Sequence, residues 1–126
     1  MPGAGCEEST VTSLSLRKRF SLREARELLP EVRRVTEPAT RSLGVLSKRI
    51  ESLEEGDPRR TQLEQDYAGR LNEWVEAVTR LGCEVKGVFL VDFDNGEGYY
   101  CWKWPETDIE HFHGYEEGFA GRLRIN

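Results

Sequence analysis

Apolar residues recur at alternating steps of three and four between residues 21 and 53. This spacing predicts a long amphipathic helix that carries the apolar seam of a coiled coil. Ser21 and Glu24 have the spacing of a capping box at the start of this helix, and Phe20 precedes them in the position of a hydrophobic staple. The predicted seam consists of Ala25, Leu29, Val32, Thr36, Ala39, Leu43, Leu46, Ile50 and Leu53.

Two prolines interrupt the pattern of this first helix. Pro30 and Pro38 each remove a backbone hydrogen-bond donor, so each should bend or break the helix locally. The alternative to one long helix is therefore a pair of helices joined near Pro38.

A second helix is predicted after a short connection. Gly56 suits the C′ position that ends the first helix, and Pro58 suits the first turn of the next one. The same spacing continues to about Leu81, and the short connection predicts that the two helices form an antiparallel hairpin. The second seam consists of Tyr67, Leu71, Trp74, Val78 and Leu81.

Two helices alone cannot cover both sides of such long apolar seams. The apolar stripe is widened further by residues that lie off the seam, namely Val35, Val45, Leu63 and Val75. We therefore expect a homo-oligomer, a dimer or higher, that forms through the helical hairpin.

The hydrophobic period changes to two after Val85, which predicts β-structure. The predicted segments are a strand at 86–93, a turn at 94–96, a return strand at 99–104, a third strand at 109–113, and a loop and tail at 114–126. The expected fold class is α+β: a long antiparallel two-helix coiled-coil hairpin followed by a small antiparallel β-hairpin or three-stranded sheet.

A two-residue turn at Asn95 and Gly96 defines the expected strand register. It would pair Val91 with Tyr100 and Phe89 with Trp102 on an apolar face that packs on the helices. The opposite face would carry Lys86, Asp92, Tyr99, Cys101 and Lys103. A bulge at Gly98 is the alternative, and it would shift this register.

Composition and charge narrow the classes of function. The chain has 126 residues and a formal net charge of −5, which argues against a nucleic-acid or membrane-surface partner. No apolar run approaches the roughly 18 residues of a membrane span. Residues 1–16 lack the pattern of a signal peptide and are predicted to be a disordered tail before a single domain at 17–126. Because the chain has three cysteines, an odd number, and no signal-peptide pattern, we expect them to be reduced thiols in the cytoplasm.

An ordered set of short motifs resembles the domain-of-unknown-function family 2203 of bacteria and archaea. The motifs are Phe20, Glu24-Ala25, Leu28-Leu29-Pro30, Val85-Lys86-Gly87, Leu90-Val91-Asp92-Phe93, Cys101-Trp102, Glu106, Ile109, His113 and Gly118-Phe119-Ala120-Gly121-Arg122. The resemblance covers about residues 19–125 and implies a helical hairpin with an appended β-element, without an established activity. Family members carry glycine where this chain has Pro105, and the family's histidine aligns with His113 rather than His111.

The residues near the carboxyl end include a set that could bind a metal ion. Glu106 and His113 are the first candidates, with Cys101 or His111 as a third ligand, because zinc accepts carboxylate, imidazole and thiolate ligands. Zinc is the first choice and other divalent transition metals follow. The alternative is that His113 is a buried, hydrogen-bonded residue and that His111 is a solvated surface group.

Arg122 could hold a carboxylate or phosphate ligand in its planar guanidinium group. The alternative, which we favour, is an internal ion pair with Asp92, Glu106 or Glu117 that fixes the C-terminal loop.

Residues of the predicted sheet and of the segment after it could also take part in acid–base catalysis, ligand stacking or nucleophilic attack. Asp92 and Glu106 could act as an acid–base pair if they converge, and Lys86 could lower the pKa of a neighbouring group. Trp102 could stack on a planar ligand, and Cys101 could act as a nucleophile, although a buried structural thiol is the favoured reading.

These patterns favour a cytoplasmic, self-assembling binding or interaction module. The alternative is a small metal-binding protein or metal-dependent enzyme that uses a Glu/His/Cys site near the carboxyl end. The sequence does not decide whether the protein is an enzyme.

Overall fold

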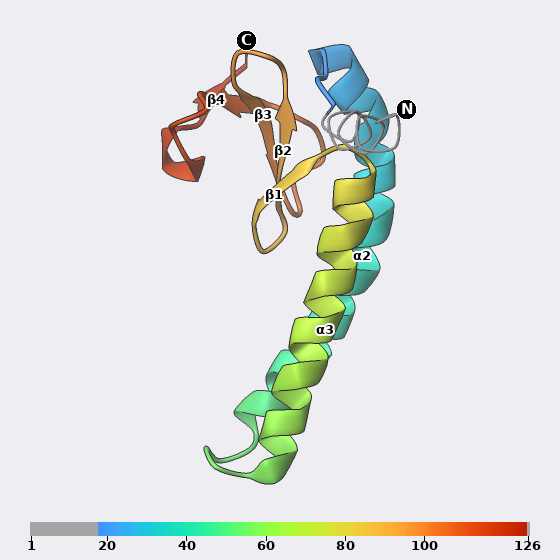
Figure 1. The fold of residues 1–126 in the computed structure, drawn as a ribbon, viewed down its shortest axis with the longest axis vertical. Coiled ribbons are helices and arrows are strands. Elements are labelled where there is room, and N and C mark those ends of the chain that lie inside the picture. Colours follow the sequence, from blue (N-terminus) through green and yellow to red (C-terminus); the bar gives the residue numbers. More distant parts are fainter. Residues whose placement is uncertain (1–17, 126) are drawn as a thin grey trace, which may run out of the picture.

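The computed structural model describes residues 18–125, so the predicted tail at 1–16 lies outside the described residues. Two long helices, α2 (Leu22–Glu51) and α3 (Pro58–Arg80), lie side by side and antiparallel, and a small sheet packs at the end where α2 begins and α3 ends (Figure 1). The fold class is α+β, as predicted, with the helical hairpin preceding the sheet.

The predicted capping box begins α2. The Oγ of Ser21 accepts a hydrogen bond from the Glu24 backbone N–H at 3.1 Å, and the Glu24 carboxylate accepts one from the Ser21 N–H at 2.9 Å. The helix continues unbroken through Pro30 and Pro38, so the alternative of two helices joined near Pro38 is wrong. Both prolines are exposed, and water can solvate the carbonyl groups that their missing N–H groups leave free.

The seam between the two helices is buried only in the half next to the sheet. Its buried residues are Ala25, Leu29, Val32, Thr36, Ala39 and Leu43 on α2, with Trp74 and Val78 on α3. The hydroxyl of Thr36 accepts a hydrogen bond from the Trp74 indole N–H at 2.8 Å and donates one to the Val32 carbonyl. The polar groups in the seam are therefore satisfied.

The other half of the hairpin, residues 44–73, contains no buried residue. It projects away from the sheet and ends in the turn between α2 and α3 (Figure 1). We call this segment the distal hairpin.

The sheet is larger than predicted. Five antiparallel strands lie in the order of the sequence: β1 (Glu84–Gly87), β2 (Leu90–Asp94), β3 (Tyr99–Lys103), β4 (His111–His113) and β5 (Leu123–Arg124). The single strand expected at 86–93 is instead a hairpin, because the chain turns at Val88 and Phe89, where Phe89 adopts a φ of 60°. The predicted loop and tail contains a short 3-10 helix, η1 (Phe119–Gly121), and strand β5.

The register between β2 and β3 also differs from the prediction. Val91 pairs with Trp102 and Phe93 with Tyr100, so the expected Val91–Tyr100 and Phe89–Trp102 pairs are wrong. The loop has four residues instead of two, because the Asn95 side chain accepts hydrogen bonds from the N–H groups of Glu97 and Gly98. The shift is an even number of residues, so each side chain stays on its predicted face.

The apolar face of the sheet packs on the adjacent ends of the helices. Phe93 meets Phe20 edge to face with ring centroids 5.4 Å apart, and Phe89 meets Trp74 at 5.2 Å. Trp102 is fully buried in the same core. Among residues 18–125, no helix is both long enough and apolar enough to cross a membrane.

Candidate functional site

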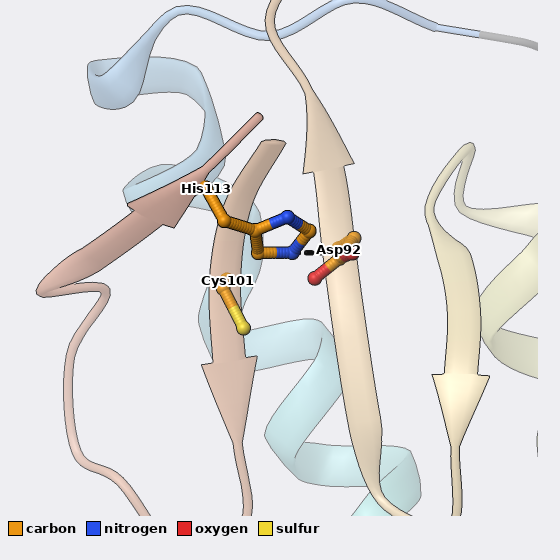
Figure 2. A group of neighbouring side chains, drawn as sticks. All are labelled: Asp92, Cys101 and His113. Atoms are coloured by element: carbon orange, nitrogen blue, oxygen red, sulfur yellow. Dashed lines mark hydrogen bonds and ion pairs between the residues drawn. The ribbon is translucent and has the colours of Figure 1, made fainter. Parts of the chain in front are cut away.

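The polar face of the sheet gathers three buried groups with metal-binding or acid–base chemistry. Asp92, Cys101 and His113 come from β2, β3 and β4, and their side chains converge over the central strand (Figure 2). Asp92 and Cys101 are fully buried, and His113 is 4% exposed. The carboxylate oxygen, thiol sulfur and ring nitrogen that they offer all lie within 4.8 Å of one another. We call these residues the triad.

A hydrogen bond joins two members of the triad. The Nε2 atom of His113 lies 2.9 Å from Oδ2 of Asp92, and its Nδ1 lies 2.8 Å from the Gly114 carbonyl oxygen. Because a carbonyl can only accept, Nδ1 carries a hydrogen. One further proton therefore lies between Nε2 and Oδ2, and the two side chains share it.

Burial dominates the electrostatics of the triad. It raises the pKa of Asp92, against the opposing effect of the His113 imidazole. Burial, together with the negative charge of Asp92, raises the pKa of the Cys101 thiol to about 12. Cys101 is thus a neutral thiol at neutral pH, which does not suit the nucleophile considered from the sequence.

One oxygen of the triad lacks a partner. Oδ1 of Asp92 is buried and accepts no hydrogen bond from any residue of the described segment 18–125. The Cys101 thiol is close enough to lower the pKa of Asp92, but it does not meet the geometry of a hydrogen bond to Oδ1. A buried acceptor without a donor is uncommon in native proteins and calls for an explanation.

A cavity of about 390 Å³ opens over the triad. Asp92 and His113 are among its lining residues, and the segment 115–119 forms part of its wall. The lining consists of Lys86, Leu90, Asp92, Tyr99, His113, Tyr115, Glu116, Glu117, Gly118 and Phe119. A cavity of this size can hold a small molecule.

Glu106 and His111 belong to a second cluster, centred on Arg122. The Nη2 group of Arg122 donates to Glu106 at 2.9 Å, to Nδ1 of His111 at 2.8 Å and to the Cys101 carbonyl at 3.4 Å. The favoured internal ion pair of Arg122 is therefore present, with Glu106 as its partner. Burial pushes the pKa of Glu106 upward, but hydrogen bonds from Arg122 and the Lys103 N–H outweigh it and hold that pKa below its usual value.

The predicted candidates thus divide between two clusters. Cys101 and His113 meet Asp92, whereas the carboxylate of Glu106 and the Nδ1 atom of His111 are engaged by Arg122. His113 is buried and hydrogen-bonded, as its alternative reading expected.

The two remaining candidates lie on opposite faces of the sheet. Trp102 lies in the core, where its indole N–H donates to the Glu106 carbonyl, so its ring does not face the cavity. Lys86 lines the cavity, with its ammonium group 3.1 Å from Glu84 and 4.3 Å from the centre of the Tyr99 ring.

Sequence reasoning did not identify two contributors to this site. The Gly114 carbonyl orients the His113 ring, and Tyr115 lines the cavity. No sequence signal marks a backbone carbonyl, and Tyr115 falls in a segment without periodicity. The period-two pattern did place Asp92, Tyr99 and Cys101 on one face, and that signal was enough to group them.

The comparisons with known proteins agree with the motifs. A model of the family described as "Uncharacterized conserved protein (DUF2203)" matches residues 18–125, which is most of the chain. No curated protein and no solved structure gives a significant match. The chain therefore belongs to the DUF2203 family.

Proposed function

We propose that this protein is a self-associating module in which two copies pair through the distal hairpin. One observation carries the proposal: residues 44–73 bury no side chain, although the apolar seam continues through them. Leu46, Ile50 and Leu53 keep the seam spacing but are only half-buried.

The incompletely covered apolar surface includes residues of the second seam and residues that lie off both seams. Val45 is 58% exposed on α2, and Leu63, Tyr67 and Leu71 on α3 are half-buried. Exposed and half-buried apolar residues that recur along a projecting helix pair suit an interaction surface. Packing two such hairpins would give a four-helix bundle, in which each stripe covers the other.

The charges of the distal hairpin favour a second copy as the occupant. Within the distal hairpin, residues 44–51 of α2 carry two basic side chains and one acidic one, and residues 58–73 of α3 carry three of each. The separation of charge is local, with Lys48 and Arg49 adjacent on α2 and Glu64 and Asp66 close together on α3. A two-fold axis would bring α2 of each copy against α3 of the other. The basic pair Lys48 and Arg49 of each copy would then meet the acidic pair Glu64 and Asp66 of the other, which supports a homodimer over an unrelated apolar partner.

The mass of the full chain in solution tests this proposal. Light scattering on a sizing column should give at least twice the chain mass of 14.5 kDa at micromolar concentration. Val45→Glu should yield a folded monomer, because it places a charge in the interface at a position that is exposed within one chain. Val88→Glu is the matched control: Val88 is 46% exposed, lies at the β1–β2 turn and should leave the mass unchanged. A monomeric wild-type chain would overturn the proposal.

A further inference from the structure

We propose that Asp92, Cys101 and His113 form a binding site for one divalent transition metal ion, with zinc as the first choice. The ion would take three protein ligands, and its fourth position would face the cavity over the triad. This site is separate from the distal hairpin and does not depend on self-association.

The three ligand atoms, and the adjacent strands that carry them, suit a divalent transition metal ion. Carboxylate, thiolate and imidazole are all ligands that zinc accepts. They project from three adjacent strands of one sheet, so their backbones are held in a fixed relation. The donor atoms now lie within 4.8 Å of one another. A tetrahedral zinc ion with bonds of about 2.0–2.3 Å needs donor atoms roughly 3.3–3.8 Å apart, a contraction of about 1 Å that side-chain rotation can provide.

The unpartnered Oδ1 of Asp92 is the independent sign of a missing ligand. It is fully buried and receives no hydrogen bond within residues 18–125. A metal ion would satisfy this oxygen. It would also replace the proton that His113 Nε2 and Asp92 Oδ2 now share, and the thiol proton of Cys101 would leave as well. Two protons depart and one divalent cation enters, so the net charge of the buried site does not change.

The surrounding contacts suit a metal ligand. The Nδ1–H of His113 donates to the Gly114 carbonyl, which leaves Nε2 as the coordinating atom. The Gly114 carbonyl also accepts a hydrogen bond from the Glu117 N–H at 3.3 Å, and the Gly114 N–H donates to the Glu117 carboxylate at 2.9 Å, so both contacts help to hold this turn in place. Metal-binding histidines are commonly oriented by such outer hydrogen bonds.

The cavity gives the ion an open side. Asp92 and His113 line the cavity, whereas Cys101 is not part of its lining. Three protein ligands with an open fourth position are the arrangement of catalytic zinc sites, where water or a substrate atom completes the coordination. The site would therefore take a small ligand with an oxygen or nitrogen donor.

Cobalt(II) titration of the metal-stripped full chain tests the site, because cobalt reports its ligands by absorption. We expect one equivalent to bind, with d–d bands of a four-coordinate ion and a thiolate charge-transfer band in the near ultraviolet. Cys101→Ser should abolish the thiolate band. Cys83→Ser is the matched control, since Cys83 is equally buried but outside the triad, and it should leave the spectrum unchanged.

Zinc competition against a chromogenic chelator measures the affinity. Asp92→Asn and His113→Gln keep side-chain size, and each should weaken binding by more than the roughly 10–100-fold cost of losing an outer-shell partner. His111→Gln should change it less than threefold, because His111 faces Arg122. Circular dichroism shows whether each variant is folded. A folded wild-type chain that binds no cobalt, or a thiolate band that persists in Cys101→Ser, would overturn the proposal.

Discussion

The two halves of the helical hairpin share one apolar spacing but differ in what covers it. Next to the sheet, the seam residues from Ala25 to Leu43 are buried, and Trp74 is only 1% exposed. In the distal hairpin, Leu46 and Ile50 occupy equivalent positions and remain half-buried. The difference arises from the sheet, whose apolar face supplies a third layer at one end only (Figure 1). A seam pattern thus predicts which side of a helix is apolar, but not what covers it.

The largest expected change in the free energy of unfolding is at Trp74, in the sheet-side half of α3, and it is compared with that at Tyr67 in the distal half. Trp74→Ala should lower the free energy of unfolding by about 3–5 kcal/mol, because it removes a fully buried ring from the seam. Tyr67→Ala is the control from the distal hairpin, and it should cost less than half as much. Both are measured by urea denaturation in the Val45→Glu background, so that association does not contribute. Equal losses at the two positions would show that the halves are equally packed.

Replacing a glycine by alanine should change stability in opposite directions in the β2–β3 loop and in the distal hairpin. A Cβ at Gly98 would lie 2.6 Å from the His113 carbonyl oxygen, so Gly98→Ala should cost roughly 1–3 kcal/mol through overpacking. A Cβ at Gly44, in the distal part of α2, would meet no atom within 4 Å. Gly44→Ala should therefore stabilise the monomeric background by about 0.5–1 kcal/mol through helix propensity. Thermal or urea unfolding of the two variants measures both effects, and a shared sign would contradict this contrast.

The smallest expected effect concerns the pH dependence of the C-terminal segment. The pKa of Glu106 is lowered in the folded chain, so its ion pair with Arg122 stabilises the fold above the ordinary glutamate pKa. That contribution should disappear as the pH falls through the lowered pKa. We expect Glu106→Gln to cost about 1 kcal/mol or less at pH 7, given the partial exposure of the carboxylate.

Unfolding measured from pH 7 down to pH 3 checks the sign of this effect. The stability difference between wild type and Glu106→Gln should shrink toward zero at the acid end. A difference that grows on acidification would show that the carboxylate is not stabilised by Arg122.

Local signals in the sequence predicted the helices well. The capping box at Ser21, Pro58 in the first turn of α3, and the apolar spacing each depend on residues close in the chain. Gly56 lies in the connection with a φ of 90°, but its expected C′ position is wrong, because α2 ends at Glu51 and Ser52 is its C-cap. The alternative of a break near Pro38 was wrong, because both prolines lie on the exposed side of a helix that the seam holds together.

The sheet was harder to predict because its details depend on non-local contacts. A turn at Phe89 with positive φ is rare for an aromatic residue, so the apolar run around it resembled one strand. The two-residue strand β5 pairs with β4 across a connection that contains η1, and no short periodic pattern reveals such a pairing.

The residues of the candidate site were predictable, and so was the shared face of Asp92 and Cys101, but the position of His113 beside them was not. The charges suggested the Arg122–Glu106 pair, and the alternation along β2 and β3 placed Asp92 and Cys101 on one face. The position of His113 beside them depends on the β3–β4 register, which pairs it with Tyr99. A seven-residue connection sets that register, and its conformation is not encoded in a local motif.

The most direct test of the central claim, that a second copy covers the distal hairpin, is a mixing experiment with charge-reversed chains. One chain carries Lys48→Glu and Arg49→Glu on α2, and the other carries Glu64→Lys and Asp66→Lys on α3. If α2 packs against α3 of the partner, each variant alone should dissociate more readily than wild type, and the equimolar mixture should form heterodimers by native mass spectrometry. A mixture that stays monomeric, or two variants that each self-associate like wild type, would contradict the account.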